Sequence, residues 1–222
     1  MPKITLNKKD TLKLIGKAIS DKQLSGAIPL IGTDLEKITK NEIEVEIFPN
    51  RPDMLSEEGF ARALSSFLGI KTGLKAYKVN KSNYKYKVDS KVKRIRPYCT
   101  AAIVKGLKFD KVSLAAIMNL QDKLHTTHGR NRKKVAMGVH DLSKIKFPLT
   151  YTTKPKSFKF RALEDKQEKT IQKILEEHPK GKDYAHLLNK SEVPIWMDAN
   201  NQVLSMPPII NSHNTGKISE KT

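Results

Sequence analysis

The sequence predicts an α+β fold made of two parts, a small N-terminal α/β domain over residues 1–88 and a mixed-sheet domain with flanking helices over residues 89–222. Three observations support this prediction. The chain has 222 residues, which is more than most single domains contain. Strand-like and helix-like apolar patterns follow one another along it. Residues 71–96 carry ten Lys or Arg and a single acid, which marks a junction between the two parts.

The first domain is expected to open with a strand and then a helix. Residues 4–6 form a short run typical of a strand. Asp10 then precedes a segment in which Leu12, Ile15 and Ile19 recur at helical spacing. Because aspartate is favoured at the start of a helix, we expect Asp10 to cap this one.

Residues 42–48 predict the clearest strand, because isoleucine and valine alternate with glutamate there. A turn is expected over residues 50–53, where the sequence Asn-Arg-Pro-Asp favours chain reversal. Ser56 can cap the following helix, and Gly69 can end it. The apolar stripe of that helix consists of Phe60, Leu64, Phe67 and Leu68.

The basic segment, residues 71–96, also contains Tyr77, Tyr84 and Tyr86. Cations interleaved with aromatic rings are typical of surfaces that bind single-stranded RNA. The same pattern is typical of an exposed edge strand whose lysines prevent pairing with other chains. The sequence leaves both interpretations open.

Five segments with strand-like patterns predict a substantial sheet in the second domain. They are residues 99–104, 135–139, 147–152, 194–197 and 203–210.

Two helices are expected among these strands. The first begins near Ser113, and one side of it consists of Leu114, Ile117, Leu120, Gln121 and Leu124. The second follows Asp165, which has Glu168 three residues further on, as in a capping box. It ends before Gly181, and its apolar face consists of Ile171, Ile174 and Leu175.

The composition is strongly basic, with 42 Lys and Arg against 23 Asp and Glu and a formal net charge of +19. Such a charge attracts phosphate polymers or an acidic partner. Lysine-rich surfaces also occur in proteins of thermophiles, so the charge alone does not identify the partner.

Cys99 is the single cysteine, which excludes an internal disulfide and fits a reducing compartment. It lies in an apolar run without a neighbouring base, so we expect a buried, inert thiol and not a nucleophile. No apolar run approaches the roughly 18 residues that a membrane span needs, and the first residues lack the apolar stretch of a signal peptide. We therefore expect a cytoplasmic protein without membrane association.

Two histidine pairs invite a catalytic or metal-binding interpretation. His125 and His128 can lie one helical turn apart, but no third ligand is evident, and no metal site is predicted. His140 precedes Asp141, and neighbouring residues on a strand point to opposite faces. We therefore expect Asp141 to begin a turn. Because no glycine-rich phosphate loop is present, any catalysis must rest on positioning and polar donors.

The loop over residues 129–134 carries four cations in six positions. They are Arg130, Arg132, Lys133 and Lys134. A loop that binds phosphate and an ordinary solvated loop both fit this composition.

Residues 203–212 contain Pro207 and Pro208 within an apolar run. Because proline cannot donate a hydrogen bond in a sheet, this segment must lie at an edge or a bulge, where backbone groups are free to bind a ligand. An irregular core strand is the alternative.

Three segments stand out together: FPNRPDMLSEEGFAR at 48–62, GRNRKKVAMGVHD at 129–141 and LSMPPIIN at 204–211. In this order and spacing they resemble the β subunit of archaeal and eukaryotic phenylalanyl-tRNA synthetases. The resemblance covers nearly the whole chain, but members of that family are much longer. The chain therefore resembles an N-terminal fragment, in which residues 89–222 would be an editing domain that ends within or just after its last strands.

The resemblance implies hydrolysis of mischarged tyrosyl-tRNA and not aminoacylation. A synthetic pocket shaped for phenylalanine rejects tyrosine only about a hundredfold, so a second, hydrolytic site is needed. A site that hydrogen-bonds the phenolic hydroxyl can refuse phenylalanine by roughly ten-thousandfold or more. Because the aminoacyl ester is activated, a held water and oxyanion donors can suffice without a catalytic triad. The group that positions this water is not implied.

The resemblance also implies site residues and partners. Arg130, Arg132, Lys133 and Lys134 would guide the acceptor end of tRNA(Phe). The catalytic α subunit would complete an α2β2 heterotetramer, which uses ATP and magnesium, whereas this fragment would need no cofactor. A non-catalytic RNA-binding module and a structural platform for the α subunit are the alternatives. The implied editing pocket consists of Gln121, His125, Leu204, Ser205, Met206, Pro207, Pro208, Asn211 and Ser212.

Overall fold

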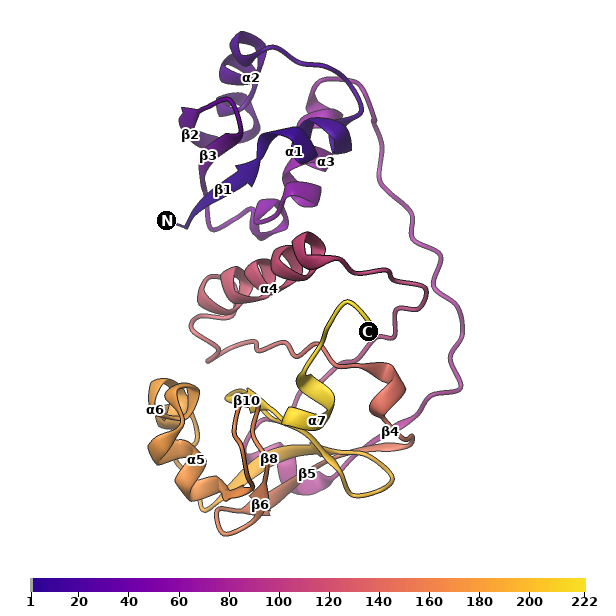
Figure 1. Ribbon diagram of the computed structural model, residues 1–222, viewed down its shortest axis with the longest axis vertical. Coiled ribbons are helices and arrows are strands. Elements are labelled where there is room, and N and C mark those ends of the chain that lie inside the picture. The colour runs from indigo at the N-terminus through magenta and orange to yellow at the C-terminus, as the bar shows by residue number, and fades with distance from the viewer. Residues whose placement is uncertain (1) are drawn as a thin grey trace. The chain divides into compact units, whose positions relative to one another are not determined.

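The computed structural model describes residues 2–222, which fold into two compact units (Figure 1). The first unit consists of the chain up to Val79 together with Ala115–Asn131. The second consists of Asn80–Leu114 and Arg132–Thr222. Helices and mixed sheets together confirm the predicted α+β class.

This division differs from the expected boundary after residue 88. The segment Tyr86–Val88 is strand β4, which pairs with a strand of the second unit, so the second unit starts earlier. Leu120 and Leu124 pack against the core of the first unit, so most of their helix belongs to that unit. The pairing and packing partners of these two segments are distant in sequence, and local patterns do not reveal them.

The first unit is built on a three-stranded antiparallel sheet with the order β1-β3-β2. The predicted strand over residues 42–48 is confirmed as β3, the central strand, and its Ile43, Val45 and Ile47 are completely buried. The elements of this unit are β1 (Lys3–Asn7), α1 (Lys8–Ile15), α2 (Asp21–Ala27), β2 (Thr33–Ile38), β3 (Glu42–Ile47), α3 (Glu57–Phe67) and most of α4 (Lys111–Thr126), with 3-10 helices η1 (Pro29–Ile31) and η2 (Pro52–Met54).

The caps of the first unit match the predictions in part. Ser56 accepts the backbone N–H of Gly59 and begins α3, as expected. The cap of α1 was expected at Asp10 but is Asn7, whose side chain accepts the N–H of Asp10 at 3.0 Å. Asp10 thus lies within the first turn, where its charge still favours the helix. Phe67 was expected in the apolar stripe of α3 but is 49% exposed, because it lies in the last turn.

The second unit is built on a five-stranded mixed sheet with the order β10-β9-β8-β5-β4. The β4–β5 pair is parallel and the other pairs are antiparallel, as the predicted mixed sheet requires. Its elements are β4 (Tyr86–Val88), η3 (Ser90–Arg94), η4 (Leu142–Lys144), β5 (Leu149–Pro155), β6 (Lys159–Phe160), β7 (Lys169–Thr170), α5 (Ile171–Glu177), α6 (Pro179–Tyr184), η5 (Ala185–Leu187), β8 (Glu192–Met197), β9 (Val203–Met206), β10 (Ile210–Asn211) and α7 (His213–Gly216).

Three of the five strand predictions for this unit need correction. Residues 99–104 and 135–139 lie outside strands, and Val104 is 65% exposed, so their apolar character does not reflect pairing. The predicted strand over residues 203–210 is a hairpin of β9 and β10, because Pro207 and Pro208 form the turn between them. The strands predicted at 147–152 and 194–197 are confirmed as β5 and β8, with shifted ends.

The second predicted helix of this unit begins later than expected. Thr170 caps α5 by accepting the N–H of Lys173, whereas Asp165 lies before the helix and forms an ion pair with Lys169 at 3.2 Å. His178 then ends α5 and caps α6. Two short helices therefore replace one, since the proline that follows His178 favours a new helix start.

Within residues 2–222, no helix combines the length and the apolar character needed to cross a bilayer.

The contact between α3 and η2 generates a prediction about stability. A Cβ at Gly59 would lie 1.8 Å from the carbonyl oxygen of Asp53, so Gly59→Ala forces the two segments apart. We expect the free energy of unfolding to fall by about 1–3 kcal/mol or more. Gly26 in α2 has no atom within 4 Å of its Cβ position, so Gly26→Ala should raise stability by roughly 0.5–1 kcal/mol. Denaturant unfolding compares the two variants, and a Gly59→Ala variant as stable as the parent contradicts this packing.

Candidate functional site

Four polar side chains of the second unit lie together, His140, Asn211, Ser212 and Thr215, hereafter the polar cluster. The Thr215 hydroxyl is its centre. Its Oγ1 lies 3.2 Å from Nδ1 of His140 and 3.1 Å from Oγ of Ser212. It also donates to the carbonyl oxygen of Leu204 at 3.3 Å. These hydrogen bonds hold the imidazole and both hydroxyls in fixed orientations.

The side chain of Asn211 is enclosed between two glycines. Its Nδ2 donates to the carbonyl of Val139 at 3.3 Å, which fixes the orientation of the amide. A Cβ at Gly138 would lie 2.9 Å from Oδ1 of Asn211 and 2.9 Å from Nε2 of His140. A Cβ at Gly216 would lie 2.3 Å from Cβ of Asn211. Because Gly138 is exposed, these two polar atoms approach one point at the surface of the unit.

The hairpin end and the short helix after it position these side chains. Asn211 pairs with Ser205 in the β10–β9 ladder, and the N–H of Ser212 donates to the carbonyl of Leu204 at 2.8 Å. Ser212 then caps α7, where its Oγ accepts the N–H of Thr215 at 3.4 Å. One carbonyl, that of Leu204, therefore binds both Ser212 and Thr215.

Burial lowers the pKa of His140 from 6.5 to about 4, so its imidazole is neutral near pH 7. The tautomer with the proton on Nδ1 donates to Thr215 and leaves Nε2 as an acceptor. Oδ1 of Asn211 is a second acceptor beside Gly138. Both acceptors face the same exposed side of Gly138, and a water molecule on that side can donate one hydrogen to each of them. The cluster can therefore orient a water without a charged group.

The segment 204–212, expected to form an editing pocket, is mostly buried. Leu204, Ser205 and Ser212 are 3%, 7% and 4% exposed, respectively. Met206 is completely buried within the hydrophobic core of the second unit. The structure brings Asn211, Ser212 and the Leu204 carbonyl together in the polar cluster. In the hairpin turn, Pro207 is half-buried and Pro208 is buried.

The remaining two expected pocket residues, Gln121 and His125, lie on α4 in the part that belongs to the first unit. Gln121 is half-buried, and His125 is 2% exposed. The segment 204–212 belongs to the second unit, so a pocket that joins it to these residues stays a prediction. Within residues 2–222, no three His, Cys, Asp or Glu side chains form a group that could hold a metal ion.

The expected phosphate-binding loop is held by an arginine that the sequence did not single out. The guanidinium of Arg96 donates to the backbone carbonyls of Arg132, Lys133 and Lys134 at 3.2 to 3.4 Å. The side chains of Arg130, Lys133 and Lys134 are exposed, as phosphate contacts require. Arg130 belongs to the first unit and the other three cations to the second.

Arg132 differs from the expectation of a solvent-facing cation. It is 8% exposed, and its Nη1 donates to the carbonyls of Ile209 at 2.7 Å and Pro208 at 3.4 Å. Its guanidinium carbon also lies 4.5 Å from the ring centroid of Tyr184. Arg132 therefore anchors the loop to the hairpin turn, a structural contact for which its basic neighbours in sequence gave no signal.

Asp141 and Cys99, the other residues weighed as catalytic candidates, mostly match the expectations from the sequence. Asp141 caps η4, and its side chain accepts the N–H of Ser143 at 3.0 Å, which confirms the predicted turn. Cys99 is half-buried, and burial raises the pKa of its thiol, which disfavours the reactive thiolate. Sequence reasoning missed Gly138 and Thr215. The only signal for Gly138 was its place two residues before His140 in one of the resembling segments.

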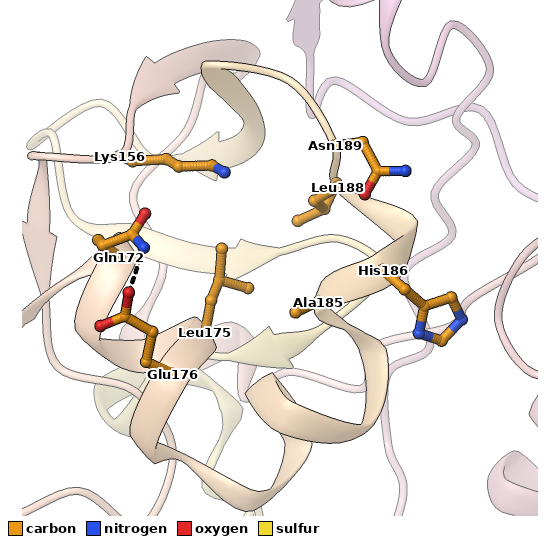
Figure 2. A pocket seen from close by; sticks show the side chains of 8 residues that line it. All are labelled: Lys156, Gln172, Leu175, Glu176, Ala185, His186, Leu188 and Asn189. Atoms are coloured by element: carbon orange, nitrogen blue, oxygen red, sulfur yellow. Dashed lines mark hydrogen bonds between the residues drawn. The ribbon is translucent and has the colours of Figure 1, made fainter.

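A shallow pocket of about 310 Å³ lies elsewhere on the second unit, beside α5 and η5. Leu175, Ala185 and Leu188 line it together with Lys156 and Asn189 on opposite sides (Figure 2). None of the residues expected in an editing pocket lines it.

The half-buried imidazole of His140 generates a prediction about pH. Because the pKa of His140 falls from 6.5 to about 4 on folding, the unfolded chain binds its proton first as the pH drops. The stability tied to neutral His140 is complete above about pH 6.5 and is lost towards pH 4. Thermal unfolding of the parent and His140→Gln between pH 7 and 4 measures this, and the variant should lose less stability on acidification. Identical pH dependence in both proteins contradicts a lowered pKa of His140.

No protein-family model matches the chain. Curated relatives match over its whole length, and both of the following are phenylalanine–tRNA ligase β subunits. The one from Archaeoglobus fulgidus is 44% identical over 223 residues, which covers 100% of this chain and 40% of the relative. The one from Methanosarcina barkeri is 43% identical over 224 residues, with the same coverage. The chain thus spans about two fifths of the length of these relatives.

A solved structure is similar throughout. It is the crystal structure of an N-terminal fragment of the phenylalanyl-tRNA synthetase β subunit from Pyrococcus horikoshii. The two share 40% sequence identity with a TM-score of 0.93, over 100% of this chain and 65% of that one. Identity and coverage at this level show that the chain belongs to the family of archaeal phenylalanine–tRNA ligase β subunits and corresponds to its N-terminal part.

Proposed function

We propose that the second unit is an editing domain that hydrolyses the ester of mischarged tyrosyl-tRNA(Phe). The observation that carries this proposal is the pair of acceptors beside Gly138, Nε2 of neutral His140 and Oδ1 of Asn211. A water held by both hydrogens keeps its oxygen lone pairs free for the ester carbonyl carbon. Positioning of this kind can supply much of the rate enhancement for an activated ester.

The reaction needs no cofactor in this unit. The water oxygen bonds to the carbonyl carbon, the ester bond to the ribose oxygen breaks, and that oxygen takes up the proton that the attacking water gives up. The products are tyrosine and uncharged tRNA. Since the imidazole of His140 is held by Thr215, its role is to orient the water.

Selectivity for tyrosine requires a polar partner for the phenolic hydroxyl. The proposed pocket wall is the segment 204–212 of the second unit, which supplies Ser205 and Ser212 as candidates. Phenylalanine lacks the hydroxyl and cannot form this hydrogen bond. When it enters the site, a buried polar group stays unpaired, which disfavours binding and hydrolysis of the correctly charged tRNA.

The rest of the assignment concerns the complete enzyme. The relatives are named as β subunits of a ligase, and we infer an α subunit partner, an α2β2 heterotetramer and tRNA(Phe) as substrate for the protein to which this chain belongs. ATP and magnesium would serve aminoacylation in that assembly. A cytoplasmic location fits protein synthesis.

The acceptor pair can be tested by filling the space beside Gly138. The Cβ that Gly138→Ala adds would lie 2.9 Å from both acceptors, closer than atoms pack, so the substitution should push the acceptors out of place and release the water. We expect hydrolysis of tyrosyl-tRNA(Phe) to slow by about tenfold or more, which requires only about 1.4 kcal/mol of lost transition-state stabilisation. Release of labelled tyrosine measures the rate.

Gly26→Ala is the matched control, because it adds the same methyl group in open space on the first unit. Its hydrolysis rate should equal that of the parent. If Gly138→Ala stays folded and also hydrolyses at the parental rate, the water does not lie there. A parent that binds tRNA without releasing tyrosine favours an RNA-binding module, and one that does neither favours a structural platform.

The proposed tRNA-binding loop predicts a change in salt dependence. Arg130, Lys133 and Lys134 are exposed, so replacing all three by alanine should reduce the slope of log affinity against log salt by roughly 0.7–0.9 for each phosphate that is no longer neutralised. Arg132 is left intact because it anchors the hairpin turn. The control replaces three exposed lysines of the first unit, Lys17, Lys22 and Lys40. Equal slopes in the two triple variants would show that tRNA binds at another surface.

A further inference from the structure

We propose that a groove beside α3 of the first unit binds a segment of a partner protein in which a carboxylate lies next to aliphatic side chains. The groove, hereafter the α3 groove, has a volume of about 540 Å³. It lies on the first unit, whereas the polar cluster lies on the second. Leu30, Phe67 and Leu74 line it together with Arg51, Asp53 and Arg62.

Large apolar side chains are concentrated on the rim of the α3 groove. Leu30 is 69% exposed, Phe67 is 49% exposed and Leu74 is 101% exposed. Each comes from a different segment: η1, the last turn of α3 and the chain after it. Exposed apolar side chains that gather around a groove with polar walls are typical of a protein-binding site.

The charge of the α3 groove selects an acidic occupant. Arg51 donates from Nε and Nη2 to the two oxygens of Asp53, both at 3.0 Å, and holds the pKa of this carboxyl below its usual range. The charges of Arg51 and Asp53 therefore cancel. Arg62 lies 3.9 Å from the same carboxylate, and Lys75 adds a further cation. Three cations against one carboxylate leave excess positive charge, which a carboxylate on the partner can complement.

The walls of the α3 groove are fixed by hydrogen bonds. Nη1 of Arg51 donates to the carbonyl of Ile31 at 3.4 Å, which ties η1 to the residue that precedes η2. After α3, the N–H of Ile70 donates to the carbonyl of Ser65 at 2.9 Å. Nζ of Lys71 donates to the carbonyl of Leu14 at 3.0 Å, which attaches the chain before Gly73 to α1. The part of the groove at η1 and α3 is therefore formed before an occupant binds, so less conformational entropy is lost there on binding.

The same features favour a protein segment over RNA. Base recognition on a protein surface uses aromatic rings as stacking platforms, and within residues 2–222 Phe67 is the single aromatic residue that lines the groove. Leu30 and Leu74 are aliphatic and offer no such platform. The Arg51 guanidinium, already bidentate on Asp53, is not free to form the same fork with a phosphate.

Photo-crosslinking in the assembled synthetase tests this proposal. Phe67→p-benzoylphenylalanine, introduced into the complete β subunit, places a light-activated group on the rim of the groove. After irradiation and proteolysis, mass spectrometry identifies the attached molecule. The expected adduct is a peptide of another protein, not of the β subunit itself, in which Asp or Glu lies within a few residues of Leu, Ile, Val or Met. Attachment to RNA, attachment to a peptide without an acid, or no attachment would each overturn the proposal.

A charge reversal in the same background tests the role of the cations. Arg62→Glu should reduce the yield of the adduct by roughly tenfold, because it replaces attraction of the carboxylate by repulsion. The control Lys40→Glu changes an exposed residue between β2 and β3 that does not line the groove, and it should leave the yield unchanged. Equal yields in both variants would show that the charge of the groove does not select its occupant.

Discussion

The enclosure of Asn211 between Gly138 and Gly216 is the constraint on which the geometry of the second unit's site depends. A side chain larger than hydrogen at either glycine would displace the amide that the Val139 carbonyl orients. The hairpin turn places Asn211 at the end of β10, and Arg132 holds that turn through two backbone carbonyls. A structural arginine and two glycines thus determine where the polar atoms of this site lie.

Regular periodicity allowed much of the fold to be predicted from the sequence. The alternation in β3 and the spacing in α3 are local signals, and both elements are confirmed. The segments 99–104 and 135–139 have the same apolar character but form no strands. Strand pairing depends on partners that are distant in sequence. The two prolines predicted an interruption, but only the structure shows that it is a hairpin turn between β9 and β10.

The site itself was less predictable than the fold. Asn211 and Ser212 were expected from the resemblance and lie in the polar cluster. His140 was noticed for its aspartate neighbour, yet its actual partner is Thr215, 75 residues away. Arg132 looked like its basic neighbours but is buried against Tyr184. Burial and long-range hydrogen bonds decide these roles, and neither follows from residue type or local spacing.

The pH dependence of hydrolysis tests most directly whether a neutral His140 orients the water. Single-turnover release of tyrosine from tyrosyl-tRNA(Phe) can be followed from neutral pH down towards the lowered pKa of this imidazole. Because burial lowers that pKa to about 4, Nε2 stays an acceptor and the rate should change little over most of this range. A rate that falls as the pH drops through 6.5, the ordinary value for histidine, or no release above the uncatalysed rate at any pH, would contradict the account.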